Sequence, residues 1–295
     1  MKKVSFIVVA LLGMLVASCN QSDEQFENAK DGPIAPVTVR VAGFSVSQEE
    51  FLRAQTRGAS NVADYNDINA VTLAFYKEDG TEAYKSTQSK GDAGFGEFSL
   101  SLPMGSYTMV ALAYFTNENS VLTLTSPTEA SYSHRARETF AYTQEVTISN
   151  TSALDISATL HRVISQLKVV SSDGKTANVS NVRMTFSAGG KDFNPTTGLA
   201  ITNTGFANTV GNSAAVGGIS TSSTVFFLNT DEQDIDVTIE TLDADGNTLF
   251  SKTIEDVPFK RNRVTKLTGA MYTNSGVDGA FQIETAWLDD YNAEF

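Results

Sequence analysis

Cysteine and histidine are scarce in this chain of 295 residues, which has one cysteine, Cys19, and two histidines, His134 and His161. One cysteine cannot form an intrachain disulfide, and so few thiol and imidazole groups cannot build the usual zinc sites. A Ser-His-Asp triad also needs a presented serine, and no Gly-x-Ser-x-Gly elbow is found. We expect His134 in a loop, His161 in a strand, and a protein that is not an enzyme and has no catalytic, cofactor-binding or metal-binding residues.

Basic residues are also few. The chain has 21 Lys and Arg against 34 Asp and Glu, which gives a formal net charge of −13. A nucleic-acid-binding protein needs a basic surface that neutralises phosphates. We therefore expect no nucleic-acid partner.

Long apolar runs are absent except at the N-terminus, where one extends from Val4 to Val16 after Lys2 and Lys3. A membrane-spanning helix needs about 20 apolar residues, so this run is too short to span. A basic start, a short apolar run and small residues after it are typical of a secretory signal peptide. The sequence predicts such a peptide over residues 1–18.

The residues Val16-Ala17-Ser18-Cys19 resemble the lipobox of bacterial lipoproteins, which are cut between the positions of Ser18 and Cys19 after a diacylglycerol alkylates the thiol. Two or more palmitate-like chains anchor a protein stably, so the lipid bilayer becomes a partner through Cys19. The acids that follow resemble an export signal, which indicates an outer membrane lipoprotein at the cell surface. The alternative is an ordinary signal peptide followed by a chance cysteine.

Apolar residues alternate with a period of two along most of the chain after Pro36, beginning with Val37, Val39 and Val41. This alternation predicts one half-buried β-strand after another. Residues 107–115 are apolar at both alternating positions, which predicts a central strand covered on both faces. Asp-Gly pairs favour tight hairpin turns. They lie between apolar runs at Asp79-Gly80, Asp173-Gly174 and Asp245-Gly246.

The alternation changes phase near His161 and Arg162, and such a change needs a bulge or a new sheet. We place a domain crossover there. Residues 198–223, rich in Gly, Ser, Thr and Asn, are expected to form a long surface loop. The predicted fold is all-β, with two tandem sandwiches of ordinary size. The predicted parts are a signal peptide (1–18), a lipidated tether (19–36), an N-terminal β-sandwich (37–160) and a C-terminal β-sandwich (161–295).

Several segments together resemble the fimbrillin superfamily, the lipoprotein precursors of pilus subunits in gut and oral bacteria with an outer membrane. In chain order they are the lipobox, the first strand VTVRV with an arginine following in TRGAS, the crossover LHRVISQLKVV, the segment FKRNRVTKLTG and the closing FQIETAWL. The resemblance runs from end to end. It implies two transthyretin-like β-sandwiches in a major, tip or anchor subunit of a pilus.

In that family an Arg-specific protease removes the first strand, and a C-terminal strand of the next subunit fills the groove by donor-strand exchange. The resemblance implies cleavage between Arg57 and Gly58, with Arg53 as the alternate. Arg57 is equally well explained as a solvated loop arginine. The removed strand would carry Val37, Val39 and Val41.

The donor strand implied by the resemblance carries Phe281, Ile283, Thr285 and Trp287. Their spacing of two would place alternate side chains in successive pockets of a groove. The same run is equally well explained as the ordinary last strand of the second sandwich.

The resemblance favours a fimbrial subunit or cell-adhesion lipoprotein, located in the fimbrium once cut and assembled. Its partners would be other pilin subunits and a host or bacterial surface ligand. An alternative in the same family is an uncut anchor or accessory subunit that stays on the membrane through Cys19. A third alternative is a surface glycan-binding lipoprotein, which the single tryptophan supports little.

Overall fold

The structure is a computed structural model that describes residues 33–45, 62–272 and 281–284. The lipobox with Ser18 and Cys19 lies outside the described residues, and so do Arg53, Arg57 and Gly58. As predicted, the fold is all-β: the described part contains strands and one short 3-10 helix, η1 (Val62–Asp64). No helix among the described residues is long and apolar enough to cross a membrane.

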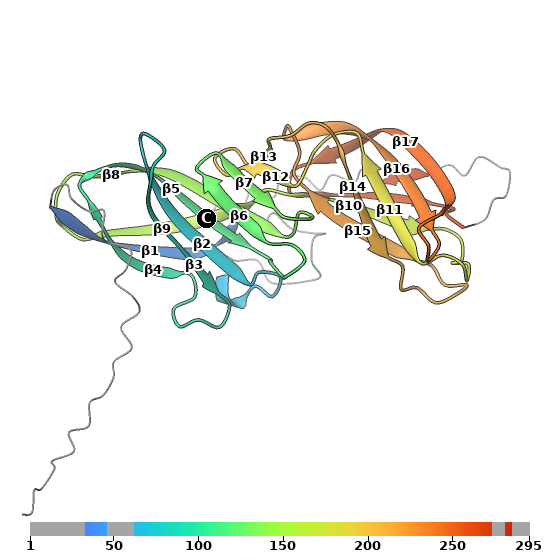
Figure 1. The fold of residues 1–295 in the computed structure, drawn as a ribbon, viewed down its shortest axis with the longest axis horizontal. Helices are drawn as coiled ribbons and strands as arrows, with labels where there is room; N and C mark the ends of the chain where they lie inside the picture. Colours follow the sequence, from blue (N-terminus) through green and yellow to red (C-terminus); the bar gives the residue numbers. More distant parts are fainter. Residues whose placement is uncertain (1–32, 46–61, 273–280, 285–295) are drawn as a thin grey trace, which may run out of the picture. The chain divides into compact units, whose positions relative to one another are not determined.

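The first lobe is one seven-stranded sheet with the order β3-β2-β5-β8-β9-β1-β4 (Figure 1). β8 and β9 are joined only by the pairs Phe140–Arg162 and Ala141–His161. The sheet therefore folds over at this seam, and one apolar core lies between its four-stranded and three-stranded layers. The strands are β1 (Ile34–Ser45), β2 (Ala70–Lys77), β3 (Glu82–Ser89), β4 (Glu97–Pro103), β5 (Gly105–Tyr114), β8 (Thr139–Ile148) and β9 (Leu154–Arg162).

The second lobe consists of two four-stranded sheets with the orders β15-β10-β18-β19 and β14-β11-β16-β17. A second apolar core, centred on Phe186, Phe226 and Phe259, packs between them. The strands are β10 (Ser165–Ser171), β11 (Asn181–Phe186), β14 (Phe206–Gly211), β15 (Thr221–Phe226), β16 (Glu232–Leu242), β17 (Thr248–Lys260), β18 (Val264–Gly269) and β19 (Gln282–Glu284).

The two lobes share one topology. In the first, β1 pairs antiparallel with β4 and parallel with β9; in the second, β10 pairs antiparallel with β15 and parallel with β18. The remaining layers match strand for strand, as β3-β2-β5-β8 and β14-β11-β16-β17. The second lobe alone adds an edge strand, β19. The chain thus repeats one seven-stranded sandwich, and β1 and β10 hold equivalent places.

A small sheet with the order β13-β12-β7-β6 combines strands from the two halves of the chain. With it, Tyr132, Phe193 and Phe227 form an apolar cluster against the outer side of β2 and β5. β5 is therefore buried on both faces, which confirms the central strand predicted for residues 107–115. The four strands are β6 (Leu122–Ser126), β7 (Glu129–Tyr132), β12 (Asp192–Asn194) and β13 (Leu199–Ala200).

The chain passes from β9 to β10 through a buried polar junction at Arg162, whose side chain is only 1% exposed. Its Nε donates to Glu138 Oε1 over 2.6 Å, Nη2 to Tyr65 Oη over 2.6 Å, and Nη1 to Asn262 Oδ1 over 3.1 Å. The guanidinium also lies 4.9 Å from the centre of the Phe140 ring. The chain changes sheet here, but residues Pro33–Phe295 form one compact unit, so the division into two domains stays a prediction.

Two of the three Asp-Gly turns are confirmed: Gly80 and Gly246 have positive φ and join antiparallel neighbours. The hairpin at Asp173-Gly174 is wrong. Here the Asp173 carboxylate accepts the backbone N–H groups of Met271 and Tyr272 over 2.8 and 2.9 Å, and the strands on either side, β10 and β11, belong to different sheets. The pair anchors a crossover.

The long loop predicted for residues 198–223 is also wrong, because β13, β14 and the start of β15 lie within it. Its polar composition misled the prediction, since some of these side chains are paired inside the second sandwich. Asn208 and Thr224 are buried, and Asn208 Nδ2 donates to Thr224 Oγ1 over 2.7 Å. A strand whose buried side chains are polar and hydrogen-bonded to each other shows no apolar alternation, so its sequence resembles that of a loop.

Candidate functional site

The first candidate site is the position of β1 in the middle of the three-stranded layer β9-β1-β4. Its register with β4 runs from Ile34–Pro103 to Arg40–Glu97. On the other side it runs parallel to β9, with a register shift between Val41 and Gly43. Both edges of β1 are therefore used, and the strand is the only connection between β4 and β9 in the described sheet.

The inner face of β1 carries Ala35, Val37, Val39 and Val41, each at most 4% exposed. They pack into the core of the first lobe with inward side chains of β4 and β9. β1 begins three residues before the predicted start of the strand, because Ala35 is already in the core. The inward neighbours are Phe98, Leu100, Leu102, Ala158 and Leu160.

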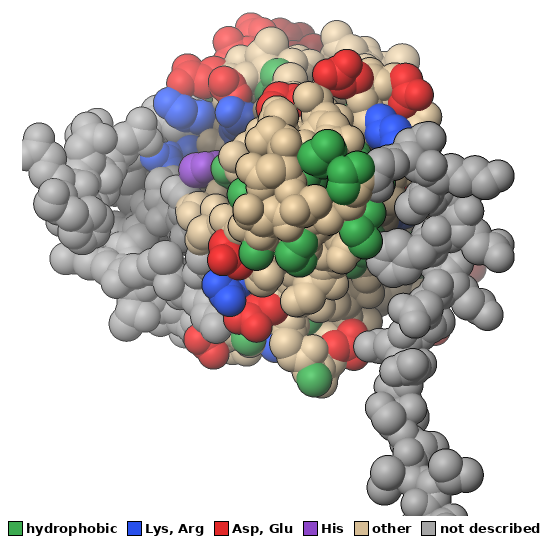
Figure 2. Space-filling model, turned by 90° about the vertical axis from the view of Figure 1, so that its left-hand side faces the viewer, with side chains coloured by type: hydrophobic (Ala, Val, Ile, Leu, Met, Phe, Trp, Pro, Cys, Tyr) green, Lys and Arg blue, Asp and Glu red, His purple; other side chains and the backbone are tan. Residues whose placement is uncertain are grey.

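The outer face of β1 is weakly held. Arg40 Nε lies 3.6 Å from Glu97 Oε1, and both side chains are more than half exposed, so this ion pair contributes little. At the start of the strand Ile34 is 54% exposed beside Met104, which is 42% exposed. Figure 2 shows exposed apolar side chains at this end of the first lobe. β1 is thus retained by its main-chain hydrogen bonds and its inner valines.

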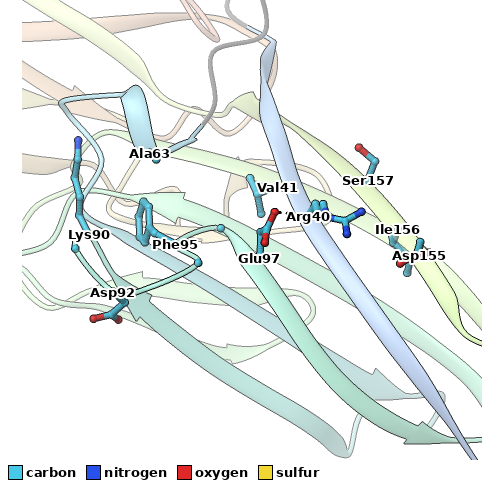
Figure 3. A pocket seen from close by; sticks show the side chains of 13 residues that line it. Arg40, Val41, Ala63, Lys90, Asp92, Phe95, Glu97, Asp155, Ile156 and Ser157 are labelled. Carbon is cyan, nitrogen blue, oxygen red and sulfur yellow. Dashed lines mark ion pairs between the residues drawn. The ribbon is translucent and has the colours of Figure 1, made fainter.

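An open cavity of about 850 Å³ lies beside β1 (Figure 3). Arg40 and Val41 line it together with Phe95 and Gly96 of the β3–β4 connection, and Gly96 has a φ of +89°. A Cβ on Gly96 would lie 2.4 Å from Val62 Cγ1, so only glycine fits. The wall of the cavity thus includes residues of β1, of the β3–β4 connection and of β9.

The last described segment lies at the edge of the second lobe. β19 pairs antiparallel with β18, with Ile283 opposite Leu267. A Cβ on Gly269 would lie 2.7 Å from the Phe281 ring, so glycine lets that ring sit against β18. Thr285 and Trp287 lie outside the described residues. In this chain the first part of the predicted donor strand is a short edge strand of its own second sheet.

The described residues hold no group of three or more His, Cys, Asp or Glu side chains that could bind a metal. His134 is exposed in the β7–β8 connection, and His161 is exposed on β9. Each therefore lies in the kind of element that the sequence predicted.

A second candidate site, not predicted from the sequence, is a pocket of about 290 Å³ beside the β7–β8 connection. Arg135 and Arg137 line it, and the guanidinium of Arg137 lies 5.8 Å from the centre of the Phe115 ring. The Nε of Arg137 is buried without a hydrogen-bond partner among the described residues. The only signal in the sequence is an Arg-x-Arg spacing in a chain with few basic residues.

The comparisons with known proteins concern nearly the whole chain. The model of a family of unknown function, DUF6562, matches residues 36–294. No curated protein matches the sequence.

Solved structures with a similar fold come from bacteria of the genera Bacteroides and Porphyromonas. A Bacteroides ovatus protein provisionally described as an adhesin aligns with a TM-score of 0.54 and 11% identity, covering 86% of this chain and 94% of its own. Another protein so described, also from Bacteroides ovatus, aligns with a TM-score of 0.52 and 13% sequence identity. This alignment covers 82% of this chain and 88% of that protein. The fimbrial anchor protein Mfa2 from Porphyromonas gingivalis aligns with a TM-score of 0.50 and 11% sequence identity. This alignment covers 88% of this chain and 98% of Mfa2. At these identities the likeness concerns the fold.

Proposed function

The chain belongs to the family of unknown function DUF6562, and we propose that it is a cell-surface pilus or adhesion subunit assembled by donor-strand exchange. The observation that carries the proposal is the place of β1 between β9 and β4. The similarity of this chain's fold to the folds of a fimbrial anchor and of two proteins provisionally described as adhesins supports a role of this kind.

Removal of β1 would open a groove with a defined chemistry. The main-chain groups of β4 and β9 that now pair with β1 would lose their partners, and the apolar side chains between them would meet water. Unpaired edges of this kind readily accept another strand. A strand from another copy would restore the main-chain hydrogen bonds and fill the places of Val37, Val39 and Val41.

The link between β1 and η1 suits such a removal. A cut after Arg57, or after Arg53, falls between Ser45 and Val62 and breaks no other strand of the described fold. It would separate Cys19, its lipid and β1 from the rest of the chain as one piece. In this proposal the lipid places the subunit in the outer membrane, and cleavage releases it into the fimbrium.

The donor in this proposal is the closing run with Phe281, Ile283, Thr285 and Trp287. Among the described residues, its pairing with its own lobe is limited to Gln282–Glu284. A three-residue edge strand has few hydrogen bonds to lose on exchange. Detachment of β19 would also leave the outer edge of β18 free.

A second candidate is an uncut anchor or accessory subunit that remains on the membrane through Cys19. The burial of β1 favours the uncut anchor, because Ala35, Val37 and Val39 are at most 1% exposed. The strand already fills the position between β9 and β4. The fold likeness to Mfa2, described as a fimbrial anchor, supports the same role.

Limited digestion with an Arg-specific protease tests the cleavage step. We expect a product that begins at Gly58 and forms ladders on an unboiled gel. Arg57→Gln should abolish this start and leave, at most, the alternate cut after Arg53, while Arg135→Gln serves as a control elsewhere in the chain. A lipidated Cys19 on assembled material would contradict the cleaved-subunit proposal and support the uncut anchor.

Deletion of residues 280–295 tests the donor separately. The deletion variant should still be cut but should form no ladder, because it has lost the strand that fills the next groove. The thermal unfolding transition of the deletion variant, compared with that of the wild type, is the control for correct folding. Ladders that persist would show that the donor lies elsewhere in the chain.

A further inference from the structure

Two arginines of the β7–β8 connection lie on the same pocket without acidic partners of their own. Neither Arg135 nor Arg137 forms an ion pair with any residue in the described ranges. Glu138 also lines the pocket, but its carboxylate is held by Arg162 over 2.6 Å. Asp67 is the other acid of the lining, and it is bonded to neither arginine. In a protein with a net charge of −13, two neighbouring cations without an acidic partner in the described part of the chain are unusual.

Hydrogen bonds from two side-chain hydroxyls fix the backbone at both arginines. Thr139 Oγ1 donates to the carbonyl of Arg137 over 2.8 Å, and the Ser120 hydroxyl donates to the carbonyl of Arg135. Ala136, between them, is buried. Both arginines line the pocket from this fixed stretch of the chain.

The guanidinium of Arg137 is not fully hydrogen-bonded within the described residues. Its Nε is buried without a hydrogen-bond partner in the described structure, although its plane rests near the Phe115 ring. Burial, with the charge of Arg135 adding to it, lowers the pKa of Arg137. An anion in the pocket would accept hydrogen bonds from the guanidiniums that line it, and it would reduce the repulsion between the two positive charges.

We propose that Arg135 and Arg137 form a binding site for the carboxylate or sulfate group of an acidic sugar. The planar guanidinium group matches these oxyanions in two-point hydrogen bonds. The rest of the lining suits a sugar ring, since Gln166 and Ser223 offer polar groups and Val225 an apolar side. A volume of about 290 Å³ is near the lower limit for small-molecule sites, which fits one ring.

This site lies outside the β1 groove and needs neither cleavage nor a donor strand. The inference goes beyond the proposed function because it names acidic sugars as the class of ligand that the subunit binds. If strand exchange fails its own tests, the sugar site can still be present, and the reverse also holds.

Calorimetric titration of the uncut full chain in detergent tests the site. The probes are glucuronate and galactose 6-sulfate as acidic sugars, glucose as a neutral sugar, and acetate and inorganic sulfate as anions without a ring. We expect saturable binding of at least one acidic sugar, no binding of glucose, and affinity at least about tenfold weaker for the ringless anions. Equal affinity for acetate or sulfate would overturn the assignment to a sugar.

Arg135→Gln and Arg137→Gln should each weaken that binding at least about tenfold, because each removes a charge-assisted hydrogen bond. Arg40→Gln removes the same charge from the exposed face of β1 and should leave the affinity unchanged. The bound sugar should raise the midpoint of thermal unfolding in the wild type and not in Arg137→Gln, which also reports that the variant folds. No saturable binding, or binding unchanged in both pocket variants, would overturn the proposal.

Discussion

Val39→Asp is expected to destabilise the protein by about 4 kcal/mol or more, a large part of the stability of a typical domain. Val39 is fully buried on the inner face of β1, and burying a valine contributes about 1.5–3 kcal/mol. The substitution also places a carboxylate in an apolar core without a partner, which adds a further cost. The free energy of unfolding in urea measures the sum.

Thr38→Asp is the matched control, because Thr38 is the next residue of β1 and points to the outer face. We expect it to cost less than about 1 kcal/mol, as is usual for residues near the surface. Equal losses in the two variants would contradict the packing of β1 described above. A large difference would show that β1 is held by the burial of its inner face, and a donor strand would need the same contacts.

Arg162→Met is expected to cost about 3–5 kcal/mol, because it leaves the Glu138 carboxylate buried without its cation. Tyr65 and Asn262 lose a hydrogen-bond donor in the same variant. The double variant Glu138→Gln/Arg162→Met should lose less than the single one, since no buried charge remains. Equal or larger loss in the double variant would show that the ion pair is not the reason.

The pH dependence of Arg162→Met follows from Glu138. Burial is the largest influence on this carboxyl and raises its pKa, while Arg162 opposes the rise. Without Arg162 the folded protein holds the proton more tightly than the unfolded chain does. Stability should therefore fall as pH rises from the ordinary carboxyl pKa through the raised one, and the fall should be steeper in the variant than in the wild type. Urea unfolding at pH 5 and pH 8 measures it.

Much of the fold was predictable because apolar residues recur at every second position of its strands. This period located β1 at Val37, Val39 and Val41, and the run over residues 107–115 located a strand buried on both faces. Where buried positions are polar, as at Asn208 and Thr224, the alternation disappears and the strand was missed. Asp173-Gly174 has the sequence of a turn, but its carboxylate is used by the backbone of Met271 and Tyr272, nearly a hundred residues away.

The candidate sites were predictable only in part. The sequence indicates that Val37, Val39 and Val41 form a strand, but not that this strand lies between β4 and β9, because pairing depends on residues distant in the chain. Likewise, Arg135 and Arg137 become a site only where Gln166 and Ser223 meet them from the other half of the chain. The periodicity of one segment carries no information about such distant neighbours.

The most direct test of strand exchange uses a chain that begins at Gly58, and so lacks β1, together with a peptide of residues 33–45. Native mass spectrometry and thermal unfolding then report binding and stability. We predict a one-to-one complex that restores cooperative unfolding, and a peptide of residues 280–294 that competes for the same place. A chain that is equally stable without either peptide, or that binds neither of them, would contradict the account.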